Sequence, residues 1–164
     1  MIIIKIDKSG LMQTLERLER AVINRAPVMR AISGIMADAV EENFAQEGRP
    51  KWQGLKPNPR RAGGKILQAT GRLASSIVSA SDNDNAVVGT NVKYAAIHQF
   101  GGQTRPHEIR PRNKKALAFG GRLVKKVNHP GSKIPARPFL LLTDQDIDEI
   151  EATMNDYLRQ VAGD

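Results

Sequence analysis

The stretch YAAIHQFGG (Tyr94–Gly102) decides the fold, together with the stretch IPARPFL (Ile134–Leu140) that follows it in the chain. The apolar side chains of the first stretch fall on neighbouring turns of a short helix: Ala95, Ala96, Ile97 and Phe100. Two glycines then end the helix, because glycine readily adopts the left-handed conformation that closes one. The sequence therefore predicts a short apolar helix, a basic hairpin over residues 103–134 and a return to the core, with no reaction centre between them.

Composition limits the class of protein. A chain of 164 residues fits one domain, and 40% apolar residues suffice for a core, although only 4% are aromatic. The absence of cysteine excludes disulfides, thiol catalysis and thiolate metal sites. No apolar run approaches the roughly 20 residues that span a bilayer, and the start, MIIIKID, is too short for a signal peptide. We expect one soluble domain over residues 1–164 that does not contact a membrane.

Charge is distributed unevenly along the chain. The net charge is +8, but residues 1–48 carry a net −1, residues 49–138 a net +15 and residues 139–164 a net −6. Such asymmetry favours an oriented interaction surface over general adhesion.

The first third of the chain predicts one strand and two helices. Residues 2–6 alternate like a strand, and Ser9 is a candidate N-cap for a helix with one apolar stripe: Leu11, Leu15, Leu18 and Val22. A second helix should begin near Pro27, run to about Gln46 and stop at Gly48. Its broad apolar face makes it the candidate for the central core helix.

Residues 47–69 show no periodicity and are rich in proline, glycine and charge. Loops of this length are usually functional or disordered. One interpretation is a solvated surface loop around a packed Trp52, and the other is an arm that becomes ordered only against a neighbouring subunit. The sequence slightly favours the arm, but it leaves open whether Trp52 anchors an interface or fills its own core.

The rest of the chain predicts short strands and a last helix. A turn at SDNDN separates Ile77–Ala80 from a returning strand that begins at Ala86. Three further strand candidates are residues 107–110, 116–119 and 123–127, with Gly120 and Gly121 in the last turn. Thr143 should cap an acidic helix over residues 143–161. About four helices and five or six strands predict an α+β fold with an antiparallel sheet packed against the helices.

No catalytic or metal-binding pattern is present. His98, His107 and His129 are too far apart in sequence for a local ligand pair. We expect His98 to be a packing or hydrogen-bonding residue on its helix, while the other two shape turns beside prolines. Ser75 and Ser76 lack a nucleophile elbow, and Gly63-Gly-Lys65 lacks the spacing of a phosphate loop. Asp144, Asp146 and Asp148 fit a helix start better than a calcium loop. We therefore predict no enzyme, no cofactor and no metal.

Five segments resemble the Mu-like phage virion morphogenesis (tail-completion) family in the family's order. They are Trp52–Leu55, Leu67–Ile77, Tyr94–Gly102, His129–Gly131 and Pro135–Leu140. The resemblance implies a structural protein of a phage or prophage particle that acts at tail completion or the head–tail junction. It also implies three kinds of partner: further copies of the chain, tail-tube or sheath subunits, and neck or connector proteins. The protein would be assembled in the bacterial cytoplasm and reside in the virion.

Complementary charges on different faces favour head-to-tail contacts and closed rings, so we expect a homo-oligomeric ring, six-fold as in tails generally. The candidate interface residues come from the loop, the basic hairpin and the last helix. They are Arg49, Lys51, Trp52, Arg60, Arg61 and Lys65; Arg110, Arg112, Lys114, Lys115, Lys125 and Lys126; and Asp144, Asp146, Asp148 and Glu149.

The alternative function is non-specific nucleic-acid binding through the basic middle region. The basic side chains of the hairpin have a spacing compatible with phosphates. Phe119 is the only aromatic residue of that region, so stacking on bases would be weak, and no helix-turn-helix or zinc finger is visible. Sequence-specific reading is therefore not expected, whereas passive contact with packaged DNA is compatible with the charge.

Overall fold

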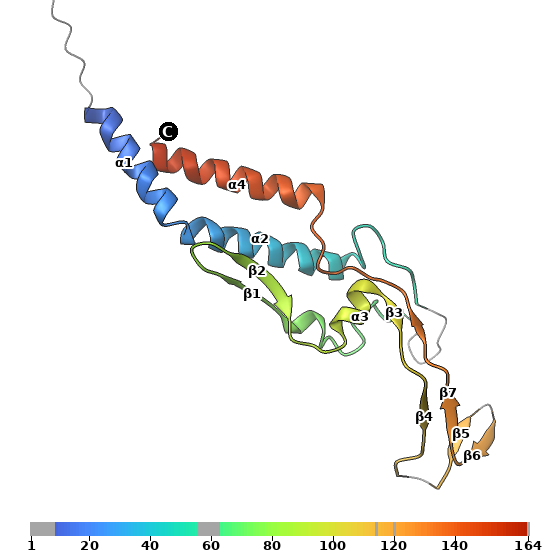
Figure 1. Ribbon diagram of the computed structural model, residues 1–164. Coiled ribbons are helices and arrows are strands. Elements are labelled where there is room, and N and C mark those ends of the chain that lie inside the picture. The colour runs from blue at the N-terminus through green and yellow to red at the C-terminus, as the bar shows by residue number, and fades with distance from the viewer. Residues whose placement is uncertain (1–8, 56–62, 114, 120, 164) are drawn as a thin grey trace, which may run out of the picture. The chain divides into compact units, whose positions relative to one another are not determined.

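The computed structural model describes residues 9–55, 63–113, 115–119 and 121–163 (Figure 1). The strand predicted over residues 2–6 lies outside these ranges. The chain forms two compact units, which we call the helical unit (Met1–Val92 with Phe139–Asp164) and the basic unit (Lys93–Pro138). The chain therefore leaves the helical unit once and returns to it through the Arg-Pro-Phe-Leu stretch.

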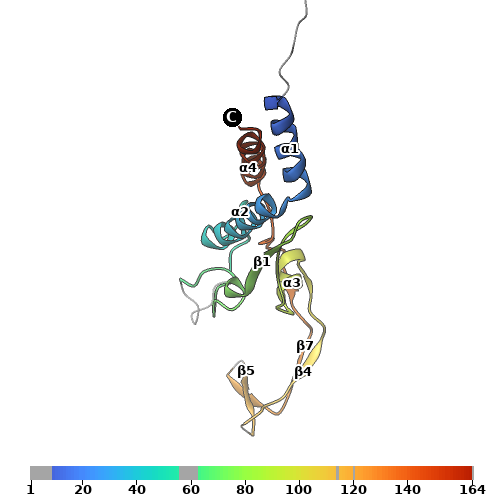
Figure 2. The same ribbon diagram turned by 90° about the vertical axis from the view of Figure 1, so that its left-hand side faces the viewer.

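Helix α2 (Ala26–Ala45) is the centre of the helical unit, as predicted. Figures 1 and 2 both show it between α4 (Asp144–Ala162) and the hairpin β1–β2, while α1 (Ser9–Ile23) packs against α4. Pro27 stands in the first turn of α2, where a missing N–H has no cost. The core is made mainly by one face of α2 and by two aromatic residues from elsewhere in the chain, and it includes Val28, Ile32, Ala39, Val40, Phe44, Trp52 and Phe139.

The predicted hairpin is present as β1 (Ile77–Ser81) and β2 (Ala86–Thr90), preceded by a 3-10 turn at Ala74–Ser76. The two strands pair antiparallel from Ile77 opposite Thr90 to Ser81 opposite Ala86. In the turn, one oxygen of Asp82 accepts hydrogen bonds from the backbone N–H groups of Asp84 and Asn85 at 2.7 Å each. This aspartate-closed turn is the local signal that made the hairpin predictable.

The basic unit begins with α3 (Ala95–Phe100), followed by three nested antiparallel pairs. Strand β3 (Gly102–Gln103) pairs with β8 (Lys133–Ile134), β4 (His107–Ile109) with β7 (Val127–His129), and β5 (Leu117–Phe119) with β6 (Arg122–Val124). The chain thus runs out along one side of the basic hairpin and back along the other.

The two stretches that decide the fold meet in the basic unit. The backbone N–H of Arg137 donates to the carbonyl of His98 at 2.7 Å. Gly101 ends α3 with φ +71° and ψ −179°, a conformation almost restricted to glycine. A Cβ at this position would lie 2.8 Å from the nitrogen of Ala136. The Ile134–Leu140 stretch therefore crosses the end of α3 at a place where only a glycine fits.

The α+β class is confirmed, but the expected sheet is not. The strands of the described residues form four separate two-stranded pairs instead of one sheet of five or six strands. Each pair in the basic unit is only two or three residues long. Strands β4 and β5 lie within the predicted candidates 107–110 and 116–119, and β6 overlaps the candidate 123–127, whereas β3, β7 and β8 were not predicted as strands.

Helix α4 starts as predicted. The Thr143 hydroxyl accepts from the backbone N–H of Asp146, and the Asp146 carboxylate accepts from the backbone N–H of Thr143, which completes a capping box. Helix α1 instead begins at Ser9 itself, one residue earlier than an N-cap serine would allow, a difference within the usual uncertainty of helix ends.

Candidate interaction surfaces

A buried polar cluster joins α2, the start of the long loop and α4. We call Asn43, Arg49, Thr143 and Asp146 the polar cluster. The Arg49 guanidinium donates to both carboxylate oxygens of Asp146, at 3.0 and 2.9 Å, and its Nε donates to Asn43 Oδ1 at 2.9 Å. Asn43 is fully buried, and its Nδ2 donates to the carbonyls of Phe139 and Leu141 at 3.0 and 2.8 Å. One asparagine thereby fixes the return of the chain into the helical unit.

The environment of Asp146 keeps it ionised. Burial alone would raise the pKa of this carboxyl, but the hydrogen bonds from Thr143 and Arg49 outweigh burial and hold the pKa below its ordinary value of 3.8. Arg49 and Asp146 were expected to bind a neighbouring copy. They bind each other within one chain, so a change at either residue acts first on the fold.

Trp52 fills the core of its own chain. It is 7% exposed and meets Phe44 edge to face, with the ring centroids 5.9 Å apart. Gly48 allows this position, because a Cβ there would lie 2.4 Å from the indole ring. Of the two interpretations of Trp52, the structure favours the packed one.

The described parts of the long loop are also held by their own chain. The N–H of Ile66 donates to the Glu47 carboxylate at 2.6 Å, and the Gln68 amide donates to the carbonyl of Phe44 at 2.7 Å. These contacts favour the interpretation of a surface loop held by its own chain, whereas the order of the loop in a free subunit stays a prediction. Lys65 is exposed, and Lys51 is exposed with its amine on the carbonyl of Gln46. Arg60 and Arg61 lie outside the described residues, as does Lys114.

The basic hairpin contains one carboxylate, which two cations share. Glu108 on β4 pairs with Arg110 on one side and with Lys126 at 2.9 Å on the other. The hydrogen bonds from Lys126 and Arg110 lower the pKa of Glu108 below its ordinary range. Arg112, Lys115 and Lys125 are exposed and make no ion pair with any described residue. Most of the hairpin's positive charge thus faces solvent.

His107 and His129 lie directly opposite each other in the β4–β7 pair. Their rings stack with centroids 5.1 Å apart. The Nδ1 of His107 hydrogen-bonds with the carbonyl of Arg105, and the Nδ1 of His129 accepts from the N–H of Gly131. Both histidines thus lie in paired strands and not in turns, although each ring contacts the backbone on the far side of the neighbouring proline. The sequence did not predict the stacking of the two rings.

His98 packs on α3 without a hydrogen bond at its Nδ1 from any described residue. Its ring meets Tyr94 edge to face. Burial, assisted by the positive charge of Arg137, lowers the pKa of His98 below its ordinary value of 6.5. His98 is therefore held neutral, as a packing residue would be.

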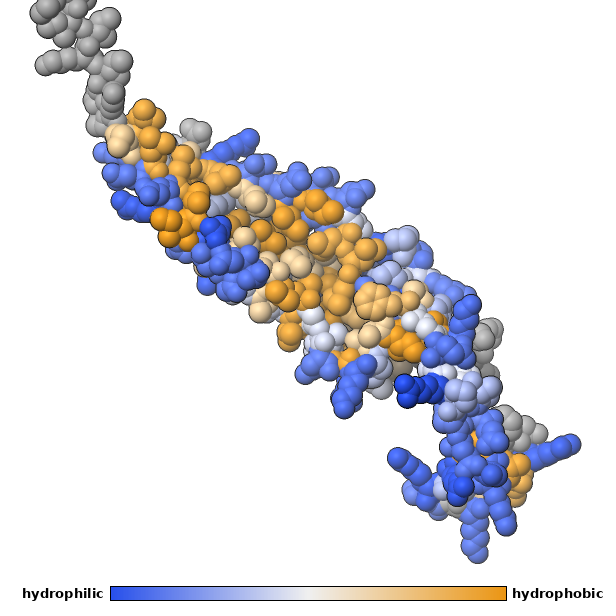
Figure 3. All heavy atoms as spheres, in the orientation of Figure 1, coloured by the Kyte–Doolittle hydropathy of each residue, from blue (hydrophilic) through white to orange (hydrophobic). Residues whose placement is uncertain are grey.

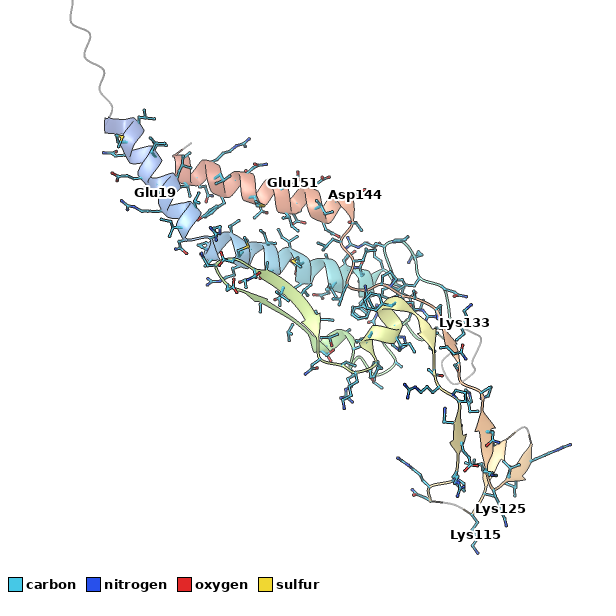
Figure 4. All side chains as sticks on the ribbon, in the orientation of Figure 1. Glu19, Lys115, Lys125, Lys133, Asp144 and Glu151 are labelled. Atoms are coloured by element: carbon cyan, nitrogen blue, oxygen red, sulfur yellow. The ribbon has the colours of Figure 1, made fainter. Side chains whose placement is uncertain are left out.

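The acidic side chains of α4 divide between the interior and the solvent. Asp146 is buried in the polar cluster, whereas Asp144, Asp148 and Glu149 are exposed. Figure 4 shows Asp144 and Glu151 pointing outward from this helix. The three exposed acids that the sequence analysis predicted as interface residues, Asp144, Asp148 and Glu149, remain candidates for an interface.

Part of the apolar surface of the helical unit is not covered by any described residue. The stripe predicted for α1 is largely exposed, with Leu11 at 61%, Leu15 at 50% and Val22 at 58%. On α4, Ile147, Met154 and Leu158 are more than two-fifths exposed. Figure 3 shows apolar residues gathered over α1 and along α2 and α4, while the basic hairpin is mainly hydrophilic. An uncovered apolar stripe of this kind is typical of an interaction surface.

Side chains that could catalyse a reaction or bind a metal ion rarely lie together in the described part of the chain. No group of three or more His, Cys, Asp or Glu residues there could hold a metal ion. A hollow of about 520 Å³ beside α2 is lined by Asp38, Glu41 and Lys65 among apolar residues. No described helix is long and apolar enough to cross a membrane.

Comparison with known proteins identifies the family of the chain. The model of the phage virion morphogenesis family matches residues 6–159, nearly the whole chain. The chain belongs to this family. It is 43% identical to the Mu-like prophage FluMu G protein 2 of Haemophilus influenzae, over 88% of this chain and 86% of that protein. No solved structure matches the chain significantly.

A second relative covers even more of the chain at lower identity. The Mu-like prophage FluMu G protein 1 of the same organism is 27% identical over 96% of this chain and 94% of its own length. Members of the phage virion morphogenesis family serve the construction of a phage particle, and the resemblance to a Mu-like morphogenesis protein is therefore confirmed.

Proposed function

We propose that this chain is a structural, non-catalytic component of a phage tail that acts at tail completion or at the head–tail junction. The observation that carries the proposal is membership of the phage virion morphogenesis family over residues 6–159. The division of the surface into a basic hairpin, an acidic helix and uncovered apolar stripes supports it, since these are the features of a subunit that binds other proteins.

In this role the chain assembles with itself into a ring, six-fold as in tails generally. Opposite charges on different parts of one chain are matched by head-to-tail contacts, and repeated head-to-tail contacts close into rings. Tail-tube or sheath subunits and neck or connector proteins are its further partners, and its place in the virion is the tail or the junction.

Electron microscopy of particles from a deletion mutant tests the role. The proposal expects normal, filled heads together with tails that are unjoined or of abnormal length. Complementation with the wild-type gene should restore joined particles. Empty or missing heads would contradict the proposal, because they would place the function in head assembly.

Non-specific nucleic-acid binding is the second candidate, because one observation favours it. The basic unit carries 11 lysines and arginines against a single acidic residue, Glu108. A surface of this charge attracts phosphates without reading bases. The basic hairpin could therefore contact packaged DNA passively, in addition to its protein partners.

A further inference from the structure

We propose that the basic hairpin of one copy binds the exposed acidic face of α4 in a second copy of this chain. The inference rests on the proposed self-assembly and specifies the two surfaces that meet.

The hairpin presents cations that its own unit cannot neutralise. Glu108 is the only carboxylate between Lys93 and Pro138, and Arg110 and Lys126 already bind it. The remaining cations of the hairpin have no carboxylate in their unit; the described ones are Arg105, Arg112, Lys115, Arg122, Lys125 and Lys133. Figure 4 shows Lys115 and Lys125 directed away from the ribbon. An acidic partner is what this surface lacks.

Helix α4 presents the matching charge in a single row. Asp144, Asp148 and Glu151 are spaced by four and three residues, so they lie on one face of the helix. All three are exposed, and none makes an ion pair with a described residue. Asp146 points inward to the polar cluster and does not belong to the row.

Both surfaces also offer apolar contacts beside the charges. On α4, Ile147 and Leu158 border the acidic row by their helical positions, and each is 44% exposed. On the hairpin, Leu123 of β6 is 79% exposed next to Arg122. Stable interfaces combine a desolvated apolar centre with a charged rim, and these two surfaces together supply both.

The charges of both surfaces identify a second copy as the occupant. A nucleic acid would bind the hairpin but not the acidic row, so α4 would remain uncovered. A second copy covers the hairpin of one chain and α4 of the next with the same contact. Because the two surfaces differ, one contact leaves a hairpin free on one copy and an α4 free on the other, so the contact can repeat head-to-tail around a ring.

Paired charge reversals test the contact. One variant carries Lys115→Glu with Lys125→Glu, and the other carries Asp148→Lys with Glu151→Lys. Native mass spectrometry and sedimentation should show self-association of each variant weakened at least about tenfold at low salt, where exposed charges act most strongly. An equimolar mixture should recover wild-type association, because the acidic hairpin then faces the basic helix and the two unchanged surfaces also face each other.

The matched control reverses two exposed cations outside the hairpin, Arg30→Glu with Lys93→Glu, and should associate like the wild type. Three results would overturn the inference: unchanged association in either hairpin or α4 variant, loss without recovery in the mixture, or a wild-type chain that stays monomeric at high concentration. A hairpin that binds α4 of its own chain, or one that binds only duplex DNA, would give either the first or the third result. None of these results alters the deletion phenotype, so the proposed role is tested separately.

Discussion

At the scale of single residues, the polar cluster shows how a charged pair can hold distant segments together. Asp146 is 6% exposed, yet four hydrogen bonds from Arg49 and Thr143 keep its carboxylate ionised. The Nη2 of Arg49, which donates to Asp146, also donates to the carbonyl of Ala39 at 2.9 Å. The end of α2, the start of the long loop and the start of α4 thus depend on one ion pair.

Removing one partner of this pair should be costly. Asp146→Ala leaves the Arg49 charge buried without its carboxylate, and we expect a loss of roughly 3–5 kcal/mol in the free energy of unfolding. Asp148→Ala, at an exposed acid of the same helix, should change it by less than about 0.5 kcal/mol. Denaturant titrations followed by circular dichroism measure both values. Equal effects of the two substitutions would show that the cluster does not stabilise the fold.

The same pair predicts a pH dependence. The pKa of Asp146 is lower in the folded chain than its ordinary value of 3.8, so the unfolded chain takes up the proton first as the pH falls. The stability contributed by Asp146 is therefore complete above the ordinary value and is lost below it. The difference in unfolding free energy between wild type and Asp146→Ala should be constant near neutral pH and should shrink from about pH 4 downward. A difference that grows on acidification would contradict this assignment.

Trp52 gives a second test at the same scale. As a core residue packed on Phe44, it should cost about 3–5 kcal/mol of unfolding free energy when changed to alanine. Phe100→Ala, at a site 79% exposed, is the aromatic control and should cost far less. If Trp52→Ala left folding intact while self-association failed, Trp52 would be an interface anchor instead.

At the scale of elements, α3 and its glycine end determine how the basic unit closes. Gly101→Ala would force a side chain into a backbone conformation almost restricted to glycine and against the nitrogen of Ala136. We expect a loss of about 1–3 kcal/mol, or more if the contact cannot relax. Gly34→Ala inside α2 is the control, because its Cβ meets nothing within 4 Å and should stabilise the helix by about 0.4–1 kcal/mol. The two substitutions should therefore shift the melting temperature in opposite directions.

The elements with local signals were the predictable ones. Three elements show their pattern within one continuous stretch of sequence. They are the apolar face of α2, the aspartate-closed turn between β1 and β2, and the cap of α4 at Thr143. Strand β4 was predicted within residues 107–110, but its pairing with β7 was missed, because the two strands lie far apart in sequence and no local pattern connects them.

The polar cluster was also missed, although two of its members left signals in the sequence. Asn43 is a polar residue next to Phe44 on the mainly apolar buried face of α2, and Asp146 stands three residues after Thr143, the spacing of a capping box. No local pattern connects Arg49 to Asp146, which are separated by 97 residues. The sequence predicted the candidate interface residues mainly by their charge. Only the fold distinguishes the exposed acids Asp144, Asp148 and Glu149 from the buried Asp146.

At the scale of the whole molecule, the affinity of the basic hairpin for DNA distinguishes a role in protein assembly from a role in nucleic-acid binding. If the basic hairpin serves mainly protein contacts, short DNA duplexes should bind weakly, without sequence preference and with a steep salt dependence. Fluorescence anisotropy titrations over a range of salt concentrations measure all three properties. Tight, sequence-selective binding at physiological salt would make nucleic-acid recognition the primary role of the hairpin.

The proposed role and the proposed contact both require a ring, and a reconstruction of the intact phage particle tests whether the ring exists. We expect density for this chain as a closed ring of head-to-tail subunits at an end of the tail or at the head–tail junction, with the basic hairpin of each subunit against α4 of the next. Density for an isologous dimer, or a particle that lacks the chain at both places, would contradict the claim.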